Sequence, residues 1–140
     1  MLERSRFLEA VKACVGTPVR HMGRRPGVGL DCVGLPIAAL ATCGVVVPPT
    51  DHYGTHPDEA TLTEGLASYC DRIDLEDAEP GDLLQVLAGR QARHVEVFTG
   101  YNECGQKLVT HAWARNGKVQ VGILTDTVMQ AWRIREIDHG

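Results

Sequence analysis

Cys32 is the side chain in this sequence best placed to act as a nucleophile. It lies in the stretch "GLDCVGL" at 29–35, between a glycine-rich loop and a run of small apolar residues. The run "CVGLPIAALATC" predicts a buried helix over 32–43 that ends at Gly44 and tolerates Pro36 in or near its first turn. Cys32 then lies at the N-terminal end of that helix, where free N–H groups and the helix dipole lower a thiol pKa. We therefore expect Cys32 to be the most reactive of the five cysteine thiols.

Two histidines on neighbouring predicted strands could serve this thiol. His94 begins a strand at 94–100, and His111 lies inside the next strand, at 107–113. Adjacent antiparallel strands can present both rings on the same face of a sheet. A nucleophilic cysteine needs an imidazole that takes its proton and a further polar group that orients the ring. The two histidines could supply both.

A structural explanation of the same residues stays open at this point. A free cysteine at position 32 could be a small buried hydrophobe, and a strand histidine is more often a satisfied core or surface residue than a base. The four remaining cysteines are expected to be packing residues: Cys14, Cys43, Cys70 and Cys104.

The composition is typical of one folded domain spanning 1–140. No segment approaches the ~20 consecutive apolar residues that cross a bilayer, so we expect no membrane partner. The net charge of −4 argues against nucleic acid, and the patch of Arg20, Arg24 and Arg25 is expected to meet a small anion or solvent. The start "MLERSRFLEAVKAC" has no signal-peptide apolar run. We therefore expect synthesis in the cytoplasm without a leader.

The spacing of potential ligands indicates neither a metal nor a cofactor. The five cysteines form no CxxC pair, so no disulfide framework or zinc knuckle is expected. His52 and His56 are four residues apart, but the glycine between them and the proline after them indicate a loop. The "GVG" at 27–29 lacks the later glycine of a dinucleotide-binding motif. We expect the protein to work without a metal or cofactor.

Helical periodicity occupies the first half of the chain. An amphipathic helix is predicted over 2–15, and another helix over 58–73. Between the first helix and Cys32, the segment 16–31 is rich in glycine and predicts an irregular loop with close backbone approaches. The later stretch "AEPGD" predicts a turn in which Asp82 satisfies local backbone hydrogen bonds.

Beyond that turn the pattern changes to short segments rich in β-formers and separated by turn residues. About five sequential strands of this kind predict an antiparallel meander. Because the helices precede the strands, the fold class is α+β, with N-terminal helices packed on an antiparallel sheet. The predicted strands cover 83–88, 94–100, 107–113, 118–124 and 132–137.

Four blocks of the sequence resemble, in order, those of the NlpC/P60 cysteine peptidases. They are "GTPVRHMGRRPGVGLDCVGL", "EPGDLLQV", "RHVEVFTG" and "LVTHAW", and the resemblance runs from about residue 6 to the C-terminus. The short phage-tail and gene-transfer-agent branch of the family is the most similar. The resemblance implies a papain-like fold and hydrolysis of the peptide stems of peptidoglycan. It also implies tail-tip proteins of a phage-like particle as partners, and that particle as the location.

The resemblance also assigns roles to individual residues. Cys32 resembles the nucleophile, His94 the general base and acid, and His111 the third, orienting residue. Asp31 corresponds to the family's acid beside the nucleophile, which helps to hold the amino group of the substrate. His21 is expected to border the substrate groove or to face solvent.

This chain departs from the family pattern at three positions. Val19 stands where the family usually has a tyrosine whose hydroxyl lies near the thiolate, and Val33 stands where a serine is common. Glu96 replaces a small residue and, by strand alternation, shares a face with His94. Glu96 could bind a cationic substrate group or hold His94 protonated, and it could also be solvated at the sheet edge.

Three functions therefore stay open. The first is a peptidoglycan hydrolase that uses Cys32 and His94. The second is a structural tail-tip protein that keeps the fold with weak catalysis, and the third is a related thiol amidase or acyltransferase. The loop at 48–57 is a candidate for docking or for covering the substrate, and it could also merely join two helices.

Overall fold

Helices occupy the first half of the chain in the computed structural model, which describes residues 1–49, 53–54 and 57–139. The α-helices of this part are α1 (Arg4–Ala13), α2 (Gly34–Thr42) and α3 (Glu59–Ala67). Each of the three predicted helices is present and is shorter than predicted. The side chain of Asp58 caps α3 by accepting a hydrogen bond from the Thr61 amide at 2.7 Å.

The prediction of a helix as far as residue 73 is wrong. The chain leaves α3 after Ala67, and Cys70–Ile73 form strand β4 instead. β4 pairs antiparallel with strand β9 (Val128–Ile134), from Cys70↔Ile134 to Ile73↔Ala131. Pairing with a strand some 60 residues away thus overrides a local apolar spacing that fits a helix equally well.

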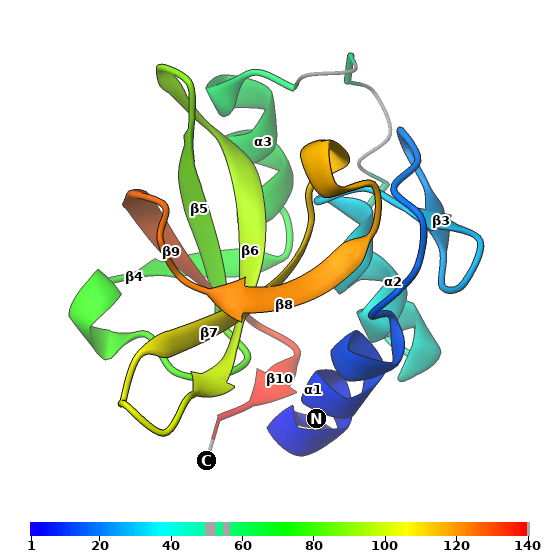
Figure 1. Cartoon of the computed structure of the whole chain (residues 1–140). Coiled ribbons are helices and arrows are strands. Elements are labelled where there is room, and N and C mark those ends of the chain that lie inside the picture. The colour runs from blue at the N-terminus through cyan, green and yellow to red at the C-terminus, as the bar shows by residue number, and fades with distance from the viewer. Residues whose placement is uncertain (50–52, 55–56, 140) are drawn as a thin grey trace.

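A six-stranded antiparallel sheet forms the second half of the described chain, as Figure 1 shows. Its order is β4-β9-β5-β6-β7-β8. The predicted meander is confirmed for β5 to β8, whereas β9 returns to pair with the other side of β5. The α+β fold class is therefore confirmed, with one strand more than the five predicted. The strands not yet given are β5 (Leu83–Ala88), β6 (Gln91–Tyr101), β7 (Lys107–Ala112) and β8 (Val119–Ile123).

Short strands and 3-10 turns complete the described fold. β1 (Leu2–Glu3) pairs in parallel with β10 (Ile137–Asp138), which brings the two ends of the chain together. The predicted loop at 16–31 contains a small hairpin of β2 (Arg24–Arg25) and β3 (Gly29–Leu30). The 3-10 turns are η1 (Leu75–Asp77) and η2 (Ala114–Asn116).

The glycines of the 16–31 loop allow the close backbone approach that the sequence predicts. A Cβ atom on Gly23 would lie 2.5 Å from the carbonyl carbon of Gly29. Only glycine fits this contact without a backbone shift. The loop can therefore fold tightly beside the start of α2.

The two faces of the sheet have different surroundings. Val95 and Val97 of β6 pack in the larger core cluster with residues of α1 and α2, such as Phe7 and Leu35. Phe98, which alternates with them, packs in a second cluster on the other side of the strand. No helix within the described ranges is both long and apolar enough to cross a membrane.

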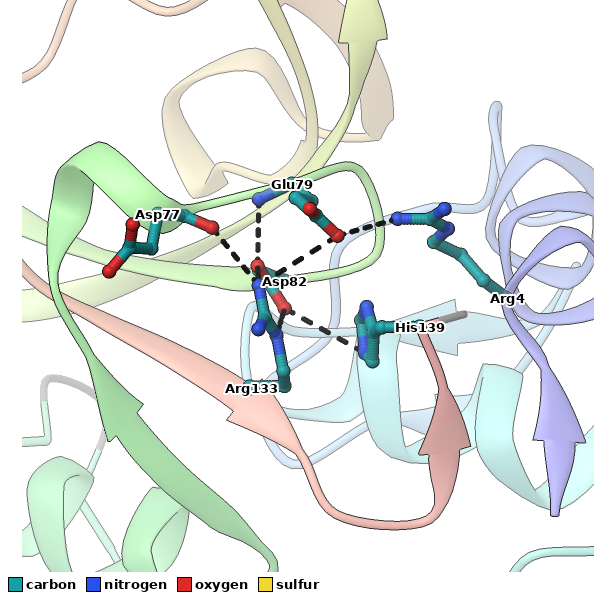
Figure 2. Close-up of polar contacts among 6 residues, drawn as sticks. All are labelled: Arg4, Asp77, Glu79, Asp82, Arg133 and His139. Atoms are coloured by element: carbon teal, nitrogen blue, oxygen red, sulfur yellow. Dashed lines mark hydrogen bonds and ion pairs between the residues drawn. The ribbon is translucent and has the colours of Figure 1, made fainter.

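Asp82 joins the turn before β5 to strand β9. Its Oδ2 accepts a hydrogen bond from the Glu79 amide at 2.8 Å, which confirms the predicted turn role. The fully buried carboxylate also accepts two hydrogen bonds from Arg133, at 3.0 and 2.8 Å, and His139 lies 3.8 Å away. Figure 2 shows Asp82 at the centre of this group, with the more exposed Arg4–Glu79 pair beside it. The sequence did not predict the Asp82–Arg133 ion pair.

Candidate active site

Cys32 lies in the turn that begins α2. The Leu35 amide donates to the Asp31 carbonyl at 3.0 Å, so the first helical hydrogen bond already encloses Cys32. The Asp31 carboxylate accepts from the Gly34 amide at 2.7 Å and caps the same turn. The Cys32 residue as a whole is partly exposed, but its sulfur is shielded from water. The predicted position of the cysteine at the helix N-terminus is therefore confirmed.

The prediction of a lowered thiol pKa at Cys32 is wrong. Removal of the sulfur from water raises the pKa of Cys32 to about 11, and the charge of Asp31 adds to the increase. Backbone N–H groups of Val95, Val33 and Cys32 itself favour the thiolate but only offset part of this effect. The helix N-terminus acts in the expected direction, and desolvation outweighs it.

The thiol meets the sheet where β6 and β7 stop pairing. The residue pairs between β6 and β7 end at Val97↔Thr110. The Val95 amide, which lies beyond this last pair, interacts with the Cys32 sulfur. Cys32 thus contacts the residue that follows His94. Within the described residues no hydrogen bond joins Cys32 to His94, so their direct contact stays a prediction.

His94, Glu96 and His111 form a buried cluster on one face of β6 and β7. Nε2 of His94 lies 2.8 Å from Nδ1 of His111. Oε2 of Glu96 lies 3.0 Å from the same His111 nitrogen and 3.8 Å from His94 Nε2. The exposed fractions are 8% for each histidine and 1% for Glu96. The structure confirms that the two rings and the carboxylate share a face, and it excludes a solvated Glu96.

The electrostatics of this cluster favour a neutral His94. Burial lowers the pKa of His94 to about 4, and the charge of His111 lowers it further, against a small opposing effect of Asp126. Burial raises the pKa of Glu96; the hydrogen bond with His111 opposes the increase, and Asp126 adds to it. The expectation that Glu96 holds His94 protonated is therefore wrong, because the nearer partner of Glu96 is His111.

Trp113 covers both imidazoles, a contact that the sequence analysis missed. Its ring centroid lies 4.9 Å from that of His94 and 5.5 Å from that of His111. A tryptophan two residues after His111, in "THAW", alternates onto the same strand face, so strand periodicity could have found it. The indole restricts the histidine rings and keeps water from one side of them.

The Asp31 carboxylate is fully engaged within the chain. It accepts hydrogen bonds from the Met22 amide at 2.8 Å, from Arg24 Nη1 at 2.9 Å and from the Tyr53 hydroxyl. The Tyr53 oxygen in turn accepts from Arg24 Nη2 at 2.9 Å. Arg24 therefore pairs with Asp31 inside the chain, which corrects the expectation that it meets a small anion or solvent. The binding of a substrate amino group by Asp31 stays a prediction.

Tyr53 brings a hydroxyl to the site that Val19 cannot supply. It belongs to the loop at 48–57, whose role sequence analysis left open, and it lies beside the Asp31 carboxylate. His21 is exposed, and its ring packs edge-on against the Tyr53 ring, with centroids 5.5 Å apart. That His21 borders the substrate groove stays a prediction. His52 and His56 lie outside the described residues.

A cavity of about 290 Å³ lies beside the thiol. Val33 and Val95, whose amides interact with the Cys32 sulfur, form part of its wall. Tyr53 also lines the cavity, together with Leu66 of α3 and Tyr69, which follows that helix. The lining is largely apolar, as in small-molecule and peptide-binding pockets.

Comparison with solved structures identifies the fold as that of NlpC/P60 proteins. One similar structure is a lipoprotein-like NLP/P60 protein of Staphylococcus aureus subsp. aureus Mu50, with a TM-score of 0.65 and 18% identity over 94% of this chain. This chain spans 41% of that protein. Another is the NlpC/p60 domain of the peptidoglycan hydrolase SagA, with a TM-score of 0.60, 21% identity, 91% of this chain and 96% of that one. No protein-family model and no curated protein matches the sequence significantly. The chain thus has the NlpC/P60 fold expected from its sequence blocks.

Proposed function

We propose that this protein is a thiol hydrolase that cleaves amide bonds in the peptide stems of peptidoglycan. Cys32 is the nucleophile, His94 the general base and acid, and His111 the residue that orients His94. The observation that carries the proposal is the position of Cys32, in the turn that begins α2 and against the amide of Val95, the residue that follows His94 of the His94–His111 pair. The NlpC/P60 fold, shared with a protein described as a peptidoglycan hydrolase, supports the same class of reaction.

The proposed reaction begins from a neutral thiol and a neutral imidazole. Both states fit the raised pKa of Cys32 and the lowered pKa of His94. His94 Nε2 faces His111, so Nδ1 is the atom left to take the thiol proton. As the proton moves, the sulfur attacks the amide carbonyl, and a C–S bond forms. The N–H groups of Cys32 and Val33, which interact with the sulfur, are the donors nearest to the developing oxyanion.

Collapse of the tetrahedral intermediate breaks the C–N bond. The His94 imidazolium returns its proton to the leaving amine, which departs and leaves an acyl-enzyme at Cys32. A water molecule, deprotonated by His94, then adds to the thioester carbonyl. The C–S bond breaks, the acid product leaves, and the thiol regains its proton.

The proposed substrate fits the surroundings of the thiol. The apolar cavity beside Val33 and Val95 can hold the aliphatic part of a stem peptide, and Asp31, which is hydrogen-bonded to the cavity-lining Tyr53, offers negative charge for an amino group. For Asp31 to act in this way, an incoming ammonium must share or replace the hydrogen bonds of Arg24 and Tyr53.

We also propose that the protein acts at the tail tip of a phage-like particle, with tail proteins as partners. The support is the resemblance of the quoted sequence blocks to the tail-associated branch. Particles that carry Cys32→Ala are expected to assemble normally and to deliver less DNA or cargo through an intact cell wall. Failure of assembly, or normal delivery, would contradict this role.

A structural protein with weak catalysis is the second candidate. Val19 and Val33 favour it, because both place apolar side chains where the resembled enzymes have hydroxyls, and so does the absence of a Cys32–His94 hydrogen bond in the described chain. Mass spectrometry of purified muropeptides incubated with the wild-type protein and with Cys32→Ala separates the candidates. New hydrolysed fragments that need Cys32 support the hydrolase. No change of mass supports the structural protein, and products joined to an added amine indicate an acyltransferase.

A further inference from the structure

The cluster of His94, Glu96 and His111 has the composition of a metal site. Each residue offers one potential ligand atom, and the three atoms lie within 4.8 Å of one another. Within the described ranges, these three residues form the candidate group of metal ligands. All three side chains are buried. Two imidazoles and one carboxylate form a ligand set that binds Zn²⁺ in proteins.

The distances allow one ion to contact all three atoms. The edges of the triangle are 2.8 Å between His94 Nε2 and His111 Nδ1, then 3.0 and 3.8 Å from these two atoms to Glu96 Oε2. A triangle with these edges has a circumscribed radius of about 1.9 Å, slightly shorter than the Zn–N and Zn–O bonds of roughly 2.0–2.2 Å. An ion just outside the plane of the triangle therefore reaches all three ligands with little movement.

Hydrogen bonding within the chain leaves this cluster incompletely satisfied. In the tautomer that the proposed mechanism uses, His94 Nε2 carries the proton and donates to His111 Nδ1, which then has no proton for Glu96 Oε2. If His111 Nδ1 carries a proton instead, that one proton faces both His94 Nε2 and Glu96 Oε2. Glu96 Oε1 is buried and has no hydrogen-bond partner among the described residues. The partly exposed Asp126 carboxyl also interacts with that of Glu96, so a second acidic group lies beside the buried one. A cation would satisfy the acceptors and offset the paired carboxylates.

We propose that His94, Glu96 and His111 bind one Zn²⁺ ion, with Asp126 or water as a further ligand. Imidazole and carboxylate together favour Zn²⁺ over Mg²⁺ and Ca²⁺, which prefer oxygen ligands. Binding at this site needs neither the Cys32 thiol nor catalysis.

The bound ion would switch off the thiol chemistry, a consequence that rests on the proposed function. An imidazole that binds a metal through Nε2 keeps its proton on Nδ1. His94 in this form cannot accept the Cys32 proton, although the fold and the cavity are unchanged. The same cluster thus orients His94 when empty and blocks it when Zn²⁺ is bound.

The test of binding is a zinc titration against a chromophoric chelator, performed on the full chain carrying Cys32→Ala and Cys104→Ala. Removal of both thiols prevents sulfur ligation at the proposed nucleophile and at the exposed Cys104, and the partly exposed Cys43 is the same in every variant compared. The expected result is one ion per chain, with a Kd of about 10 µM or tighter. Glu96→Gln, which keeps the shape of the side chain, should weaken binding at least about tenfold. The matched control, Glu103→Gln on the exposed hairpin, should bind as the parent does.

Two results would overturn the site: a Kd weaker than about 100 µM for the parent, or equal binding by Glu96→Gln. Circular dichroism checks that the variants fold, and His111→Gln replaces Glu96→Gln if the latter does not. With the wild-type thiols restored, Zn²⁺ at ten times its Kd should lower muropeptide hydrolysis about tenfold, and a chelator should restore it. Tight binding without any hydrolytic activity would reject the proposed function and leave the site standing. Hydrolysis without zinc binding would reject the site alone.

Discussion

Nε2 of His94 and Nδ1 of His111 lie 2.8 Å apart, and this contact determines which nitrogen of His94 is free for chemistry. Both rings are buried under Trp113, so the pair has little freedom to rotate. His94 must therefore use Nδ1 toward any substrate or thiol. The role proposed for His111 is to maintain this orientation.

Loss of the His111 ring should slow the chemical step more than it weakens substrate binding. For His111→Ala we expect kcat to fall about 10²-fold with KM nearly unchanged, because His94 loses its orienting partner. His111→Asn retains a polar group and should recover part of the loss. Steady-state kinetics on a defined muropeptide measure both constants in metal-free buffer. A KM effect with unchanged kcat would mean that His111 binds substrate instead.

Alkylation of Cys32 should be slow at neutral pH and should accelerate as the pH rises. A thiol with a pKa of about 11 is only about 10⁻⁴ thiolate at pH 7, and its thiolate fraction increases roughly tenfold per pH unit below that pKa. Iodoacetamide labelling with peptide mapping should find the exposed Cys104 modified first. Rapid labelling of Cys32 near pH 6 would show an activated thiolate and would contradict the effect of burial described above.

Neutralisation of Asp31 should selectively weaken substrates with a free amino group. Asn at this position can still cap the Gly34 amide, so the start of α2 should be retained. We expect Asp31→Asn to raise KM about tenfold for such a muropeptide, the range for a hydrogen bond to a charged group. The same peptide with an acetylated amine is the control and should show no added loss. Equal losses on both peptides would assign Asp31 a structural role alone.

Asp82 should contribute more to stability than the exposed Arg4–Glu79 pair of the group in Figure 2. Asp82→Ala removes a fully buried carboxylate and leaves the Arg133 guanidinium without its main partner. Because the Arg133 side chain is 30% exposed, we expect a loss of about 2–3 kcal/mol, below that of a fully buried pair. Arg4→Ala breaks the exposed Arg4–Glu79 pair and should cost less than about 1 kcal/mol. Urea unfolding measures both, and equal losses would contradict the account.

Local patterns predicted most of the fold because most of its elements are locally encoded. The β-rich composition of residues 83–88 and 118–124, between turn residues, indicates strands without knowledge of their partners, and β5 and β8 were found there. Cys70–Ile73 was misassigned because its apolar spacing fits a helix, and only pairing with β9 decides its conformation. The position of β9 beside β5 likewise depends on contacts distant in sequence.

In the candidate site, too, local sequence patterns predict some features, and contacts distant in sequence determine the others. The position of Cys32 before α2 and the shared face of His94 and Glu96 follow from local periodicity, whereas the place of His111 on that face also depends on the register of β6 and β7. The direction of the Cys32 pKa does not, because the burial of the sulfur depends on how α2 packs against β6. The hydroxyl of Tyr53 reaches Asp31 from 22 residues away, which no local spacing indicates.

The central claim is that Cys32 performs the chemistry, and the activity of Cys32→Ala tests it most directly. The measurement is kcat/KM for hydrolysis of a purified muropeptide by the wild type, by Cys32→Ala and by the control Cys104→Ala, in chelator-treated buffer. We predict that Cys32→Ala loses at least about 10⁴-fold, as expected when a covalent nucleophile is removed, whereas Cys104→Ala retains wild-type activity. A folded Cys32→Ala protein that hydrolyses the muropeptide within tenfold of the wild type would contradict the claim.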